Sequence, residues 1–228
     1  MNRSVLIVGA GSGLSSSLAL QCANLGMDVA LAARNIEKLE DLGAQTRASL
    51  HKCDASKIED VHRLFKDLDE KLGIPELVVY NPSARLRGAI ETLDPEKTKK
   101  ALEVTCFGAF LVAQQAAKRM LKRGSGSIFF TGASAGVKGF ANSSVFAMGK
   151  FGLRGLAQAL ARELHPKNIH IGHFVIDGGI KSNVRADRKG NYDMLDPDEI
   201  AKTYLQFHDQ NKSAWAWEVE LRPWVETF

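Results

Sequence analysis

The sequence predicts an α/β protein built on one doubly wound, parallel β-sheet. Short apolar runs alternate along the chain with longer segments of helical periodicity. The first apolar run also leads into a glycine-rich loop, and a helical segment follows it. Alternation of this kind is typical of parallel strands joined by right-handed crossovers. Because 228 residues show no break in composition and no internal repeat, we expect a single domain over residues 1–228.

In the first part of the chain, each predicted strand is a short apolar run such as SVLIV or ELVVY. The predicted helices have apolar residues at helical spacing or end at a glycine. The run ASLHKC is the weakest of the strands. Strands are predicted at 4–8, 28–33, 48–53 and 76–80, and helices at 14–26 and 57–73.

In the second part, two helices begin at Asp-Pro pairs, Asp94-Pro95 and Asp196-Pro197. Such pairs combine an N-cap side chain with a proline at the first helical position. The first of these helices is predicted to run without interruption over 95–122. Strands are predicted at 127–131, 168–176 and 216–222, and a further long helix at 143–164.

Composition and charge indicate which kinds of molecule the protein is expected to bind. A net charge of +4 is mild, and no basic run is interleaved with aromatic residues, so we expect no nucleic-acid partner. No segment approaches the roughly 18 apolar residues of a membrane span, and the N-terminal apolar run is too short for a signal peptide. Three distant cysteines and six scattered histidines predict reduced thiols and no metal site. We therefore expect a cytoplasmic protein that acts on a small molecule.

The loop after the first strand, VGAGSGLSSS, predicts a nucleotide site. Gly9, Gly13 and Ser15 follow the spacing G-x-x-x-G-x-G, between a strand and a helix. Glycines let backbone N–H groups approach a pyrophosphate, and the helix N-terminus favours negative charge. The alternative is a glycine-rich turn without a ligand. The candidate binding residues are Gly9, Gly11, Ser12, Gly13 and Leu14.

The end of the second strand, LAARN, bears on the choice of dinucleotide. NAD sites usually have an acidic residue here for the ribose 2′-hydroxyl. This chain has Ala33, then Arg34 and Asn35. A guanidinium binds a 2′-phosphate through charge-assisted hydrogen bonds, so the pattern favours NADP(H) over NAD(H). The alternative is a solvent-exposed surface arginine.

With these loops in view, nearly the whole chain resembles the short-chain dehydrogenase/reductase family, whose fold is of the Rossmann type. GAGSGLS resembles the family's glycine motif, and NPSA stands where the family has N-N-A-G. DGGIKS stands where the family has P-G-x-x-x-T beside the nicotinamide, and Asp54 stands at an aspartate near the adenine. The resemblance implies cofactor contacts from Asp54, Ala55, Asn81, Pro82, Ser83, Thr131, Lys150, Asp177, Gly178, Gly179, Ile180 and Ser182.

The departures from the family lie where its catalysis takes place. The family's lysine is matched by Lys150, which the resemblance assigns to the nicotinamide ribose. The tyrosine that exchanges the substrate proton is replaced by Phe146, one helical turn earlier. The serine position holds Ala133, with Ser134 beside it, and the asparagine position holds Thr105. Three of the four catalytic groups are therefore replaced.

Phe146 cannot donate a proton, so a carbonyl substrate requires another donor. Candidates are Ser134, Ser143, Ser144, a water molecule, or Lys150 with a pKa lowered by apolar surroundings. For Ser143 and Ser144 a helix cap is the competing role. A substrate that takes the proton on carbon, such as an activated alkene, depends less on a phenol.

Two functions follow. The leading hypothesis is an NADP(H)-dependent oxidoreductase that transfers hydride to or from a small carbonyl, alcohol or activated alkene through a non-standard proton donor. The rival is a catalytically inactive NADP(H)-binding protein, a redox sensor or partner subunit. A nucleotide-binding protein of another α/β class is disfavoured by the setting of Lys150. The resemblance also implies a substrate lid at 181–196, which includes Tyr192, and a homodimer or homotetramer.

Overall fold

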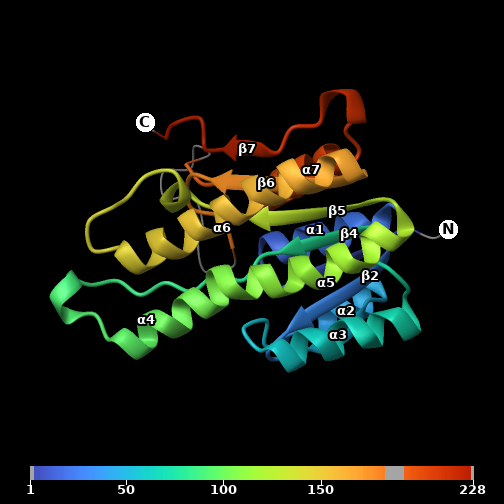
Figure 1. The fold of residues 1–228 in the computed structure, drawn as a ribbon, viewed down its shortest axis with the longest axis horizontal. Coiled ribbons are helices and arrows are strands. Elements are labelled where there is room, and N and C mark those ends of the chain that lie inside the picture. Colours follow the sequence, from blue (N-terminus) through green and yellow to red (C-terminus); the bar gives the residue numbers. More distant parts are fainter. Residues whose placement is uncertain (1–2, 183–192, 227–228) are drawn as a thin grey trace.

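Parallel strands form the centre of the molecule in the computed structural model, which describes residues 3–182 and 193–226 (Figure 1). Every strand in these residues belongs to one sheet, with the order β3-β2-β1-β4-β5-β6-β7. This sheet confirms the predicted fold class. The strands are β1 (Ser4–Val8), β2 (Asp28–Ala33), β3 (Ser49–Lys52), β4 (Leu77–Tyr80), β5 (Gly126–Thr131), β6 (Ile169–Ile176) and β7 (Glu218–Leu221).

Helices cover both faces of the sheet and bury two separate apolar cores. One core joins the sheet to the helices α1 (Leu14–Asn24), α2 (Glu40–Thr46) and α7 (Pro197–His208). The other joins it to α3 (Ile58–Lys71), α5 (Gly108–Arg123) and α6 (Ser144–Leu164). Burial on both faces explains why the central strands are continuous apolar runs in the sequence.

The Asp-Pro pairs begin helices as predicted. Asp94 accepts a hydrogen bond from the Lys97 N–H at 2.8 Å, at the start of α4 (Pro95–Leu102). Asp196 accepts one from the Asp198 N–H at 2.9 Å, at the start of α7. At the other end of α5, Gly124 has a φ of 80°, a left-handed conformation that stops the helix.

The predicted long helix over 95–122 is present, and its helical residues run from Pro95 to Arg123, but its middle is not α-helical. A π-helical turn, Glu103–Phe107, separates α4 from α5. The hydroxyl of Tyr80 donates a hydrogen bond to the carbonyl of Val104, which gives that carbonyl a partner outside the helix. Because Tyr80 lies at the end of β4, far from Val104 in the sequence, the helical periodicity of 95–122 could not indicate this hydrogen bond. Such turns are frequent at functional sites.

The strand order reverses between β1 and β4, and a ligand site is expected at this point of the sheet. β1 pairs with β2 on one side and with β4 on the other, so the chain reverses its direction of winding there. All the strands point the same way, and the loops that follow them gather at one edge (Figure 1). Ligands of doubly wound sheets bind outside this edge.

The predicted lid falls largely on residues 183–192, which lie outside the described residues, as does Tyr192. The segments on either side of them meet: Leu195 donates to the Gly179 carbonyl, and the Lys181 N–H donates to the Leu195 carbonyl. None of the helices in the described part of the chain has the length and apolar character needed to span a membrane.

Candidate active site

The glycine loop is held against both neighbours of β1. Gly9 and Gly13 have φ values of 78° and 88°, which favour glycine. The side-chain amide of Asn81, at the end of β4, donates to the Ser15 hydroxyl at 2.7 Å. A Cβ at Gly9 would collide with the ring of Pro82. The glycine loop and the end of β4 are therefore packed against each other.

A cavity of about 430 Å³ opens beside this loop. Asp54 lies in its wall, and its carboxylate accepts hydrogen bonds from the backbone and hydroxyl of Ser56 at 3.1 and 2.7 Å. Arg34 and Lys38 lie at its exposed rim. Lys38 was not among the predicted residues. The predicted residues that line this cavity are Gly9, Ala33, Arg34, Asn35, Asp54, Ala55, Asn81, Pro82 and Ser83.

A few of the predicted binding residues line neither this cavity nor the larger one described next. Leu14, at the start of α1, has its side chain buried in the core. Thr105 is buried, and its hydroxyl accepts a hydrogen bond from the Ala84 N–H at 3.0 Å. The other predicted residues outside both cavities are Gly11, Ser12, Gly13 and Ser182.

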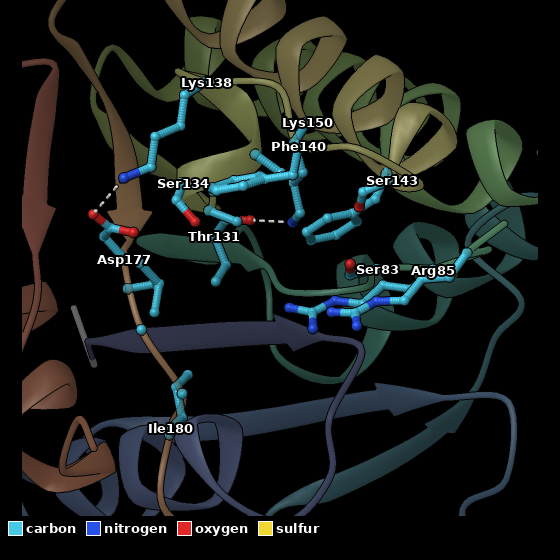
Figure 2. Close-up of a pocket in the computed structure, with 18 of the residues that line it drawn as sticks. Ser83, Arg85, Thr131, Ser134, Lys138, Phe140, Ser143, Lys150, Asp177 and Ile180 are labelled. Atoms are coloured by element: carbon cyan, nitrogen blue, oxygen red, sulfur yellow. Dashed lines mark hydrogen bonds and ion pairs between the residues drawn. The ribbon is translucent and has the colours of Figure 1, made fainter. Parts of the chain in front are cut away.

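A larger cleft of about 990 Å³ adjoins the smaller cavity, and Asn81 and Ser83 line both (Figure 2). Its walls come from the loops after β4, β5 and β6 and from the start of α6. The predicted residues brought together here are Asn81, Ser83, Thr131, Ala133, Ser134, Ser143, Phe146, Lys150, Asp177, Gly178, Gly179 and Ile180.

Lys150 is the most deeply placed cation in the described wall of this cleft. Its side chain is 2% exposed, and its ammonium donates a hydrogen bond to the Thr131 carbonyl at 2.6 Å. Burial, together with a smaller contribution from the positive charge of Arg85, lowers the pKa of Lys150 to about 7. The group is thus able to gain or lose a proton near neutral pH.

Phe146 stands in an apolar setting. Its side chain is 7% exposed and forms a small cluster with Ala133 and Ala135. The Lys150 ammonium lies 5.9 Å from the centroid of its ring. The positions that the family resemblance assigns to two hydroxyl groups are therefore occupied by methyl and phenyl groups.

The three serines proposed as alternative proton donors lie in two different places in the structure. Ser134 and Ser143 line the cleft. Ser144 does not; it lines an apolar groove on the outer face of α4, α5 and α6, so it is no longer a candidate donor. Asp177 lines the same cleft. Its carboxylate is paired with Lys138 at 3.5 Å (Figure 2) and with Arg222 at 3.4 Å.

The sequence interpretation missed several cationic and aromatic side chains of the cleft: Arg85, Arg87, Lys138 and Phe140. Arg85 and Arg87 follow β4 in the stretch RLR. In an extended segment, residues two apart point to the same side. That alternation, directly after a strand that ends at the cleft, was a signal available in the sequence.

The family model described as short chain dehydrogenase matches residues 3–193. This chain belongs to the short-chain dehydrogenase family. A short-chain dehydrogenase from Rhodopseudomonas palustris is 33% identical and has a TM-score of 0.87, with 98% of this chain and 100% of that chain covered. The sepiapterin reductase of Chlorobaculum tepidum is 28% identical over 237 residues, 98% of this chain and 97% of that protein.

A more distant short-chain dehydrogenase shares the fold. A metagenomic short-chain oxidoreductase, solved in complex with NADP, is 23% identical and has a TM-score of 0.84, with 97% of each chain covered. Within residues 3–182 and 193–226, no three His, Cys, Asp or Glu side chains are grouped so that they would hold a metal ion.

Proposed function

We propose that this chain is an NADP(H)-dependent oxidoreductase that transfers hydride to or from a small carbonyl, alcohol or activated alkene without a phenol donor. The observation that carries the proposal is Lys150. Its ammonium is buried beside the cleft and has a pKa of about 7. A buried lysine with a shifted pKa, in the wall of a cleft, is a candidate functional group.

The smaller cavity fits the adenosine half of NADP(H). Gly9 and Gly13 have no side chains and adopt left-handed backbone conformations, and Asp54 and Asn81 supply polar groups at the cavity wall. Arg34 and Lys38 place two cations at the end of β2, where a 2′-phosphate would be bound. The metagenomic family member that was solved with NADP supports the same choice.

The larger cleft fits the reacting half. A bound nicotinamide supplies the hydride, and the protein supplies position and electrostatics. Lys150 holds a proton at its Nζ that it exchanges near neutral pH, and Ser134 and Ser143 offer hydroxyls in the same cleft. Placed acids usually contribute about 10²–10⁴-fold to rate, so we expect slow carbonyl reduction without the phenol.

One observation favours the rival, a cofactor-binding protein without turnover. Phe146, Ala133 and Ala135 form an apolar cluster where two catalytic hydroxyls stand in the resembled pattern. A group of this kind neither donates nor accepts a proton. The rival therefore predicts that the cofactor binds and that hydride stays on it.

Deuterium transfer separates the two functions. NADPH deuterated at C4 of the nicotinamide is incubated with the protein and a panel of aldehydes, ketones and activated alkenes, and the products are analysed by mass spectrometry. We expect saturable NADPH binding and deuterium in at least one product, with loss of transfer in Lys150→Met. Binding without deuterium in any product supports the rival. Absence of saturable binding of either NADPH or NADH overturns both.

A further inference from the structure

Lys150 and Arg154 lie one helical turn apart on α6, so their side chains leave the same face of the helix. Lys150 reaches β5, where its ammonium donates to the Thr131 carbonyl at 2.6 Å (Figure 2). Arg154 reaches β7, where its guanidinium donates two hydrogen bonds to the Glu218 carboxylate at 2.7 and 2.8 Å. One face of α6 is therefore fixed to two different strands of the sheet.

His173 of β6 contacts the same carboxylate. It stands directly beside Glu218 in the sheet, and its Nδ1 lies 2.9 Å from the Glu218 carboxylate. The His173 side chain is fully buried. Burial lowers the pKa of His173 to about 4, so the ring is neutral at neutral pH. Because a carboxylate only accepts hydrogen bonds, Nδ1 carries the ring proton and donates a hydrogen bond to Glu218.

Glu218 thus joins α6, β6 and β7 at one point. Burial works against its ionisation, but the hydrogen bonds from Arg154 and His173 outweigh burial and lower the pKa of Glu218. The carboxylate is therefore ionised at neutral pH. A bidentate, charge-assisted pair of this kind is both strong and directional. We call Arg154, Glu218 and His173 the α6 anchor.

The second ring nitrogen of His173, Nε2, lies against the backbone of the cleft wall. A Cβ at Gly132 would come within 2.4 Å of it, and Gly132 lines the cleft directly after Thr131. Among the described residues, Nε2 has no hydrogen-bond partner. The anchor therefore packs against the strand end whose carbonyl accepts the hydrogen bond of Lys150.

We propose that the α6 anchor is a group of positioning residues for Lys150, holding α6 so that the ammonium stays buried in the cleft wall on the Thr131 carbonyl. None of the three anchor residues lines either cavity of the site, so they act through Lys150 and not on a ligand. The assignment rests on the proposed function, in which Lys150 exchanges the proton. When the bond between α6 and β7 is lost, that face of α6 is free to shift and water reaches the ammonium.

The titration of Lys150 tests the anchor without cofactor or turnover. In protein labelled with carbon-13 at the lysine Cε, the Lys150 signal is identified by its absence in Lys150→Met, and its chemical shift is followed with pH. In the parent we expect a midpoint near 7. In Glu218→Gln and in Arg154→Met we expect the midpoint to rise by about one pH unit or more, toward the ordinary 10.5, because the ammonium becomes hydrated.

The direction of the change separates position from charge. Loss of the negative charge of Glu218 would by itself lower the midpoint, whereas loss of the positive charge of Arg154 would by itself raise it. A rise in Glu218→Gln therefore reports a displaced Lys150. Asp69→Asn is the matched control, because it breaks another pair with an arginine, between Asp69 of α3 and Arg119 of α5 at 2.7 to 3.0 Å. It should leave the midpoint of Lys150 unchanged.

A midpoint that stays the same or falls in Glu218→Gln overturns the proposal, and so does a parent in which Lys150 titrates at its ordinary value. A rise of equal size in Asp69→Asn also overturns it, because general loosening of the fold would then explain the effect. If Glu218→Gln does not fold, Glu218→Asp decides, since it keeps the charge and shortens the side chain; we expect a smaller rise, and an unchanged midpoint refutes the anchor. The deuterium-transfer assay decides the proposed function separately: a rise in the midpoint without transfer supports the anchor together with the rival function.

Discussion

Replacing Lys150 with methionine should change how stability depends on pH. The folded chain holds the Lys150 ammonium almost out of water, and its pKa falls from the ordinary 10.5 to about 7. Between these two values the unfolded chain binds a proton at this site that the folded chain does not. The free energy of unfolding of the parent therefore rises with pH over this window, because stability rises wherever the unfolded state binds more protons.

The size of the effect follows from the shift. Below the folded pKa of about 7, both states carry the proton and the contribution is constant. Above it, the slope approaches about 1.36 kcal/mol per pH unit. Between about pH 6 and about pH 9, the parent should therefore gain about 2.7 kcal/mol relative to Lys150→Met, which has no titrating group at this site.

Urea unfolding of both proteins, at equal concentration and ionic strength, measures this difference across the pH range. Subtracting one curve from the other removes the contributions of groups that both proteins share. Lys66→Met, which changes an exposed lysine on α3, is the control for loss of a lysine elsewhere in the fold. A difference between the parent and Lys150→Met that stays constant with pH would show that the ammonium is not held at a lowered pKa, and the assignment of Lys150 as a proton-exchanging group would fail.

Three further predictions concern the cofactor, the reaction and assembly. Arg34→Ala should reduce the preference for NADPH over NADH about tenfold, through loss of a charge-assisted contact, in fluorescence titrations of both cofactors; equal affinities in the parent contradict this. Ala133→Ser combined with Phe146→Tyr should give little gain in the rate of NADPH oxidation with simple aldehydes and ketones in steady-state assays, because the cleft is arranged around the Phe146 ring. A gain in rate of about a hundredfold or more, about 2.7 kcal/mol, would instead indicate a decayed enzyme. We also propose that the apolar groove of about 850 Å³ on α4, α5 and α6 is a dimer interface, since Phe107 and Phe110 are each 42% exposed there. Phe110→Glu should then shift sedimentation toward the monomer, and a parent that is monomeric at micromolar concentration rules the interface out.

Sequence patterns predicted the sheet because each strand and helix cap is marked by residues that are close together in the sequence. Each central strand is buried on both faces, so it appears as a continuous apolar run such as Val5–Val8 or Leu77–Tyr80. The Asp-Pro pairs cap helices through contacts two or three residues away, within the reach of a short motif. The short helix α2, with few apolar positions, did not stand out from the loops around it.

Local spacing and strand order also predicted part of the candidate active site. Phe146 and Lys150 lie one helical turn apart, so their joint presence at the cleft follows from spacing alone. The glycine loop and the end of β4 meet because both follow neighbouring parallel strands. The sequence thus predicted many of the residues that gather at this edge of the sheet, although not Arg85, Arg87, Lys138 or Phe140. It did not predict that Leu14 packs into the core or that Ser144 faces the outer groove.

Tertiary contacts decided the conformation of the π-helical turn and of the loop that carries Arg85. The π-helical turn depends on a hydroxyl from Tyr80, 24 residues before the carbonyl that it contacts. The Ala84 N–H, next to Arg85, donates to the hydroxyl of Thr105, which is 21 residues further along the chain. The Arg85 guanidinium lies over the ring of Phe146, which is more distant still in the sequence. Periodicity and short motifs describe only interactions within a few residues. Where a loop is shaped by partners this distant in sequence, the direction of its side chains follows from the packing of the whole domain.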